Sequence, residues 1–212
     1  SSYLHKALKE QRLRLAFQPI VDSKTGKFAY YESLLRIVND KGELISAGPY
    51  IPASERTGLI NTIDEIVFEM VMKELYENKE IKLAFNISSL AIENDFLLNK
   101  IKTTLSQNLD IANRLIVEIT ETAAYNDLGK AAYFFACLQD MGCKIALDDF
   151  GAGHSSFRQL KALPLDIIKI DGTFVRNIAE NPDSKLFIRF LLDITKNMGL
   201  KTVAEFVETG EI

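Results

Sequence analysis

The sequence lacks the features of a disulfide-linked or membrane-spanning protein. It has only two cysteines, Cys137 and Cys143. Each lies in an apolar segment, which favours buried, reduced thiols over a disulfide or a metal site. There is no stretch of about 20 apolar residues and no signal peptide. We therefore expect a cytoplasmic protein with no membrane segment in this chain.

Positive charge is also in short supply. The 25 lysines and arginines are outnumbered by 29 aspartates and glutamates, so the net charge is −4 and the pI is near 5.4. Binding a DNA or RNA backbone needs a basic surface, and the composition therefore argues against a nucleic acid polymer as the main partner. A small anionic substrate remains compatible with it if positive charge is concentrated locally.

Length and composition favour one domain over residues 1–212. The chain of 212 residues is 47% hydrophobic and 25% charged, which is enough to bury a sizeable core. No obvious interdomain linker interrupts it. The chain opens with Ser1-Ser2 and ends with Glu211-Ile212. We expect a domain excised from a longer multidomain protein.

Turn and periodicity signals predict strands that alternate with helices. Ser23–Gly26 is a turn between strands predicted over Leu13–Asp22 and Lys27–Ile37, which must run antiparallel if they pair. Further strands are predicted over Ile81–Ile87, Leu115–Thr120, Cys143–Leu147, Leu165–Ile170 and Leu200–Ala204. Helices are predicted near Tyr3–Gln11, Leu59–Val71, Glu93–Gln107, Leu128–Met141, Ser155–Ala162 and Asn181–Met198.

The alternation is typical of a parallel α/β sheet. The predicted strands, with the first antiparallel to the second, fall one strand and one helix short of a closed (β/α)8 barrel. An open doubly wound sheet is the alternative, but for a dinucleotide it would carry a Gly-rich phosphate turn after an early strand, and none is present. The sequence therefore favours a modified TIM barrel with an antiparallel first strand, whose last strand and helix are missing from this chain.

Residues with oxygen ligands stand where short apolar runs in the predicted strands stop. They are Glu32, Asn86, Glu118, Asp148, Asp149 and Glu205. In a barrel these ends form the floor of the active site, where so many carboxylates need cations because like charges raise one another's pKa. Oxygen ligands suit Mg²⁺ or Mn²⁺ better than Zn²⁺. Two such ions about 3.5–4 Å apart would bind a phosphodiester and activate water, and Lys169 and Arg36 would supply positive charge to the phosphate.

Each of these residues by itself has a plainer interpretation. A strand-end Glu is often a solvated rim residue, and Lys169-Ile170-Asp171 fits a surface ion-pair network. A glycoside hydrolase built on paired carboxylates is a further alternative, but it leaves Lys169 and Asn86 unexplained. Only the joint pattern points to metal-assisted chemistry on a phosphate.

Taken together, these motifs resemble the EAL family of cyclic di-GMP phosphodiesterases. The matching segments cover essentially the whole chain, in family order: Phe17–Val21, Glu32–Arg36, Ile51–Gly58, Asn86–Ser88, Glu118–Glu121, Asp148–Ser156, Lys169–Asp171 and Ala204–Thr209. The resemblance implies metal-dependent hydrolysis of the phosphodiester bond of cyclic di-GMP to linear pGpG, in bacterial second-messenger signalling. It also implies a homodimer and fused sensory or GGDEF-type domains.

The resemblance further implies a role for each matching residue. One metal ion would be held by Glu32, Asn86, Glu118 and Asp148. Asp148 would also bind a second ion, which Asp149 would hold. Glu205 would be the general base or orient the water, and Lys169 would also position that water. The substrate would be contacted by Gln18 and Arg36.

The loop Asp149–Ser156 is the region that the resemblance ties to dimerisation. Glu121 would brace this loop, which links the metal site to the dimer interface in the family. Ala152 and His154 replace the commoner Thr and Tyr in it. These two departures would affect how the loop links the metal site to the dimer interface.

Of three other departures, the small Ser33 should be harmless and the remaining two bear on activity. Ser33 stands where Ala is usual, and the family's last strand with its Gln-Gly motif is absent from this chain. Phe206 stands where Gly usually follows the base, and its bulky side chain would shift Glu205 or narrow the site. The alternative function is therefore a catalytically silent cyclic di-GMP receptor or protein-interaction scaffold. Loss of metal ligands is usual in such members, and this chain keeps them.

Overall fold

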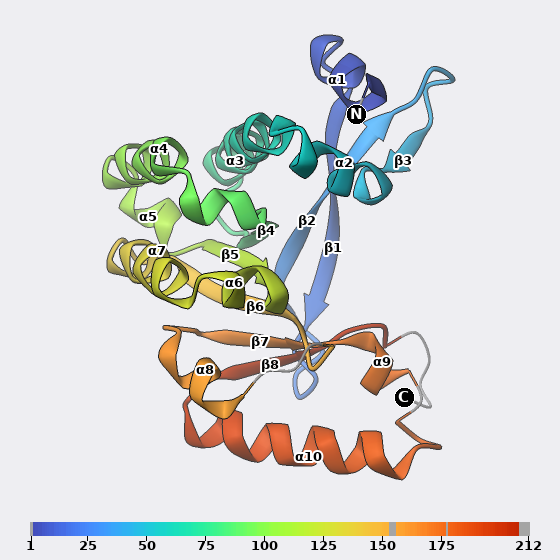
Figure 1. Ribbon diagram of the computed structural model, residues 1–212, viewed down its shortest axis with the longest axis vertical. Helices are drawn as coiled ribbons and strands as arrows, with labels where there is room; N and C mark the ends of the chain where they lie inside the picture. The colour runs from blue at the N-terminus through green and yellow to red at the C-terminus, as the bar shows by residue number, and fades with distance from the viewer. Residues whose placement is uncertain (1, 153–155, 177, 208–212) are drawn as a thin grey trace. The chain divides into compact units, whose positions relative to one another are not determined.

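The computed structural model describes residues 2–152, 156–176 and 178–207. The chain falls into two compact units, Ser1–Ile116 and Val117–Ile212. Both units combine helices with strands (Figure 1). Among the described residues, no helix is long and apolar enough to cross a membrane.

The strands of the first unit begin with the predicted antiparallel pair. β1 (Leu13–Val21) pairs with β2 (Phe28–Val38), with Gln18 opposite Glu32. The Asp22 carboxylate closes the connecting turn by accepting hydrogen bonds from the backbone N–H groups that follow it, at 3.0 and 2.8 Å. β4 (Leu83–Asn86) runs parallel to β2. β3 (Leu44–Ser46), which is antiparallel to β2, was not predicted and is only three residues long.

The longest helix of the first unit follows the predicted spacing. α3 (Leu59–Glu77) buries residues that recur every three or four positions: Ile60, Ile63, Asp64, Val67, Phe68, Val71, Met72 and Leu75. This is the apolar stripe of a helix that covers a sheet. The other helices are α1 (Ser2–Lys9), η1 (Gly48–Tyr50), α2 (Ile51–Arg56), η2 (Ser89–Glu93), α4 (Asp95–Ser106) and α5 (Leu109–Ala112).

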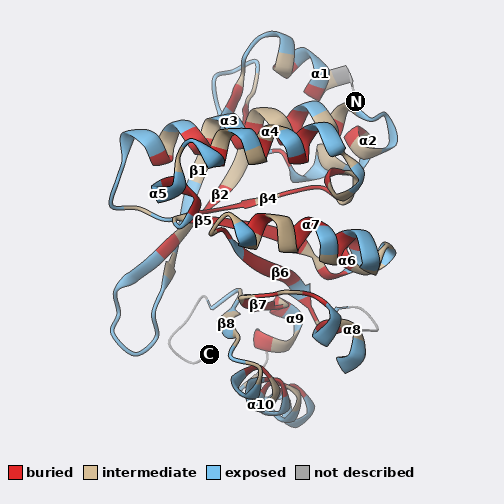
Figure 2. Cartoon of the chain, turned by 90° about the vertical axis from the view of Figure 1, so that its left-hand side faces the viewer, coloured by how far each residue is buried: buried red, intermediate tan, exposed pale blue. Residues whose placement is uncertain are grey.

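The strands of the second unit lie in chain order. They are β5 (Leu115–Thr120), β6 (Lys144–Phe150), β7 (Ile167–Ile170) and β8 (Lys201–Ala204), and β7 is parallel to both β6 and β8. Buried residues run almost continuously along β5, β6 and β7 (Figure 2). Strands covered on both faces have this pattern. β6 continues three residues beyond the predicted end at Leu147.

The helices of the second unit connect these strands, as the alternation predicted. They are α6 (Glu121–Asn126), α7 (Leu128–Asp140), α8 (Phe157–Ala162), α9 (Gly172–Val175) and α10 (Pro182–Asn197). α10 contacts α9 and β8, as Figure 1 shows. Asn181 caps α10 through hydrogen bonds from two backbone N–H groups, as its position before a proline indicated. The short helices α6 and α9 were not predicted.

Candidate active site

A buried lysine organises the acidic side chains of the second unit. Lys169 on β7 is 1% exposed. Its ammonium Nζ lies 2.8 Å from Glu118 Oε2, 3.0 Å from Asp148 Oδ1 and 3.1 Å from Glu205 Oε1. A buried charge is tolerated when it is paired and hydrogen-bonded. The four residues come from the ends of β5 to β8, so the predicted strand-end residues of this unit do come together.

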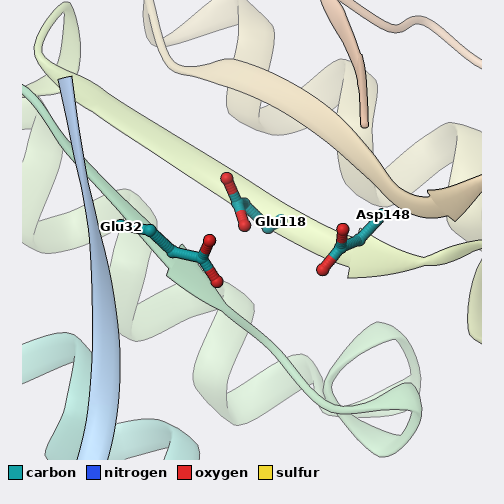
Figure 3. Close-up of side chains that lie close together, drawn as sticks. All are labelled: Glu32, Glu118 and Asp148. Carbon is teal, nitrogen blue, oxygen red and sulfur yellow. The ribbon is translucent and has the colours of Figure 1, made fainter. Parts of the chain in front are cut away.

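Glu118 and Asp148 are the most deeply buried acids of this cluster. Glu118 is 0% and Asp148 8% exposed, and their carboxylate oxygens approach within 4.8 Å. Figure 3 shows both carboxylates beside each other at the ends of neighbouring strands. At this separation the two like charges repel, and the Lys169 ammonium offsets part of that repulsion.

A bulge in β6 brings a second aspartate into the cluster. In a regular strand Asp148 and Asp149 would face opposite sides of the sheet. The pairing of β6 with β7 instead shifts register between Leu147 and Phe150, and Asp149 has a φ of 55°. A bulge of this kind re-aims a side chain. Oxygens of Asp148, Asp149 and Glu205 consequently lie within 4.8 Å of one another.

Burial and neighbouring charge keep a proton on Glu205 up to an unusually high pH. Desolvation, and then repulsion from Asp148, raises the pKa of Glu205 to about 7, while attraction to Lys169 opposes the rise. Repulsion from Asp149 adds to it. The raised pKa thus reflects burial first and the crowding of carboxyl groups second.

The donor set of the cluster fits a hard divalent cation. The groups of close ligand atoms that the structure contains are all carboxylates, the ligand type that Mg²⁺ and Mn²⁺ prefer. Burial, and then repulsion from Asp148, raises the pKa of Glu205, and a bound cation would relieve that repulsion. Residues of the second unit that fit a metal ion are thus Glu118, Asp148, Asp149 and Glu205.

Glu121 contacts the base of the loop that it was predicted to brace. Its side chain is 2% exposed, and its Oε2 accepts a 2.8 Å hydrogen bond from the backbone N–H of Gly151. Gly151 has a φ of 101°, and a Cβ there would lie 2.8 Å from the ring of Phe174. Glycine is therefore required at this position. His154, which departs from the family pattern, lies outside the described residues.

The first unit holds the remaining predicted site residues. Asn86 Nδ2 donates a 2.9 Å hydrogen bond to Glu32 Oε1, because parallel pairing sets Glu32 opposite Ala84 on β4. Gln18 lies directly opposite Glu32 on β1. Arg36 is four residues further along β2, which is about 13 Å in an extended strand. Glu32, Asn86 and Gln18 therefore form one group within this unit, and Arg36 lies apart from them.

Sequence reasoning missed a buried aspartate in the first unit. Asp64 on α3 is 4% exposed. Its Oδ2 accepts a 2.5 Å hydrogen bond from the Oγ of Ser88, which lies two residues after Asn86 in the sequence. Burial raises the pKa of Asp64 to about 7. The available signal was its helical spacing, since Asp64 stands four residues from the apolar Ile60 and Phe68. An acid within an apolar stripe usually has a buried partner.

Known proteins match nearly the whole chain. The family model described as "EAL domain" matches residues 2–212. The cyclic di-GMP phosphodiesterase PdeF of Escherichia coli (strain K12) is 32% identical over 213 residues, which cover 99% of this chain and 28% of that protein. The chain spans 25% to 34% of the length of this and other curated relatives that it matches.

Solved structures are similar over nearly the whole chain. A complex of the MucR phosphodiesterase from Pseudomonas aeruginosa with c-di-GMP has a TM-score of 0.88 at 32% identity, covering 99% of this chain and 87% of that one. The FimX EAL domain from the same species, bound to c-di-GMP, has a TM-score of 0.89 at 27% identity, covering 99% and 86%. These likenesses confirm the predicted α/β barrel class.

Proposed function

This chain belongs to the EAL domain family, whose model matches residues 2–212, and from that premise we propose that it hydrolyses cyclic di-GMP to linear pGpG. The observation that carries the proposal is Lys169, buried and ion-paired with Glu118, Asp148 and Glu205 at successive strand ends. A receptor needs no such dense arrangement of acids around a cation, whereas phosphoryl chemistry does.

We propose that the site uses two divalent ions, Mg²⁺ or Mn²⁺. Asp148 and Asp149 fit this role by their proximity, and Glu118 by its burial beside Asp148. Glu32 and Asn86 stay predicted ligands on the strength of the family resemblance. Such ions neutralise phosphate charge and lower the pKa of a bound water.

The protein groups supply proton transfer and positioning. Glu205 accepts the proton of the attacking water, which its pKa near neutrality suits. Its partner Lys169 holds the carboxylate of Glu205 in place at 3.1 Å and directs positive charge toward the reacting phosphate. Gln18 and Arg36 are proposed to contact the substrate, as the resemblance implies.

Hydrolysis of cyclic di-GMP with Mg²⁺ or Mn²⁺ tests the proposal. Wild type should release pGpG, and Glu205→Gln should lower kcat by about 10²-fold or more while cyclic di-GMP binding is kept. Glu180→Gln, at an exposed residue of the same unit, is the matched control and should leave kcat unchanged. Binding without turnover in the wild type would contradict the enzyme proposal and favour the receptor alternative.

The receptor alternative draws on one observation, Phe206 beside the proposed base. The FimX EAL domain, which has a similar fold, has a crystal structure with c-di-GMP bound. Absence of both binding and turnover would instead favour a scaffold.

We also propose that the domain works as a homodimer within a longer protein with sensory or GGDEF-type domains. The curated relatives are about three times as long as this chain, which supports the longer protein, and the homodimer is proposed on the family resemblance alone. Analytical ultracentrifugation tests the dimer, and a monomer at micromolar concentration would contradict it.

A further inference from the structure

The chain turns sharply directly after the proposed base. β8 ends at Ala204, and the backbone N–H of Glu205 still reaches the carbonyl of Ile170 at 3.4 Å. Phe206 then adopts a φ of 54°, in the left-handed region that non-glycine residues rarely occupy. A phenylalanine in this conformation needs contacts that hold it there.

Gly172 provides one of these contacts. It is buried at the start of α9, and the Phe206 ring lies in the space that a side chain at position 172 would take. A Cβ there would lie 2.9 Å from both Cε2 and Cγ of Phe206, closer than such atoms normally approach. Gly172 is not among the glycines with positive φ. Its lack of a side chain is therefore required by the ring and not by the backbone.

Arg176 provides the other contact. Its Cζ lies 3.9 Å from the centroid of the Phe206 ring, well within the range of a cation–π interaction. Gly172 and Arg176 lie on the same turn of chain, which begins where Asp171 caps α9 through the backbone N–H of Thr173 at 2.8 Å. The ring thus connects the end of β8 to the segment that follows Lys169 on β7.

From these contacts we infer that Phe206 is a positioning residue for Glu205. The ring, held by Gly172 and Arg176, fixes the backbone at 206 and so keeps the Glu205 carboxylate 3.1 Å from Lys169. A glycine at 206 would adopt the same φ without strain but would leave that backbone free to move. The inference rests on the proposed function, because it assigns Phe206 to the base of that reaction.

A double-mutant cycle between Gly172 and Phe206 tests the inference. Phe206→Gly should lower kcat about tenfold while leaving the Kd for cyclic di-GMP unchanged. Gly172→Ala should do the same, because its methyl group displaces the ring. Adding Gly172→Ala to Phe206→Gly should cause no further loss, since no ring remains to be displaced.

The controls separate positioning from other roles. Phe206→Tyr keeps the ring and should keep kcat, and Val207→Ala, at the exposed neighbour, should also have no effect. Additive losses in the cycle, or a change in Kd with kcat unchanged, would overturn the inference while the hydrolase proposal stands.

Crystal structures test the same inference without turnover. In Phe206→Gly the Glu205–Lys169 ion pair should be lost or lengthened relative to wild type, and an unchanged ion pair overturns the inference. A wild-type protein that does not hydrolyse cyclic di-GMP contradicts the proposed function instead, so the two failures remain distinct.

Discussion

Glu205 shows at the scale of single residues how position changes chemistry. A free glutamate carboxyl titrates near 4.5, but burial and the charge of Asp148 raise the pKa of Glu205 to about 7. Lys169 limits the rise. The same side chain on a solvated loop would be fully ionised at neutral pH and a weaker base.

The metal-free protein should therefore lose stability as pH rises from about 4.5 to about 7. Folded Glu205 holds its proton through this window while unfolded Glu205 releases it, so the folded state binds more protons and the free energy of unfolding falls with pH. Glu205 should account for about 3 kcal/mol of this loss. Urea unfolding in EDTA measures it.

Comparing wild type with Glu205→Gln isolates the contribution of Glu205 to the pH dependence of stability. Asp64 has a raised pKa in the same range, but it contributes equally to both proteins and cancels in their difference. The variant should gain stability relative to wild type as pH rises. If the difference in the free energy of unfolding between the two proteins stays constant from pH 4.5 to 7, Glu205 does not titrate in that range.

At the scale of elements, the irregular end of β6 decides the composition of the acidic cluster. The register shift and the φ of 55° at Asp149 allow two consecutive aspartates to reach one site. A positive φ at a non-glycine residue costs of order 1–3 kcal/mol and is typical of functional sites. The bulge thus costs local stability and adds a further carboxylate to the cluster.

Asp149→Asn should weaken Mg²⁺ or Mn²⁺ binding by at least about tenfold. Asn tolerates the left-handed conformation, so the bulge should persist while one negative charge is lost. Isothermal titration calorimetry measures the affinity. Asp140→Asn, at an exposed residue of α7, should bind as tightly as wild type. Equal affinities in the two variants would remove Asp149 from the ligand set.

Long elements were predicted better than short ones. The helices α3, α4, α7 and α10 extend over enough residues to show a periodic apolar pattern, whereas the short strands β4, β7 and β8 are recognised as short, largely apolar runs. β3, α6 and α9 have three to six residues, too few for such a pattern. α9 nevertheless carries Gly172, and α6 begins with Glu121, so the missed elements bear directly on the site.

At the scale of the whole molecule, the proposed metal ions should stabilise the folded chain. Ligands that bind only the folded state raise its free energy of unfolding by about 2.7 kcal/mol at 100 times Kd. Calorimetry should show Tm rising with Mg²⁺ or Mn²⁺ and falling after EDTA, with NaCl of equal ionic strength as the control. A Tm that does not depend on the divalent ion would contradict metal binding.

The sequence alone determined the class of the fold and the residue types of the site. Apolar runs alternating with helical segments specify a mostly parallel sheet, and a short turn after Asp22 specifies an antiparallel first pair, because these signals are local. Strand-end acids together with Lys169 indicated the chemistry. The family model that matches residues 2–212 confirms the resemblance based on these motifs.

Only the tertiary structure decided which residues act on one another. It alone showed that Lys169 pairs with three acids, that a bulge adds Asp149 to the cluster and that Phe206 lies against Gly172. Glu118 and Glu205 are far apart in sequence, and their separation in space depends on how the strands pack. Desolvation, which sets the pKa of Glu205, likewise exists only after that packing has excluded water.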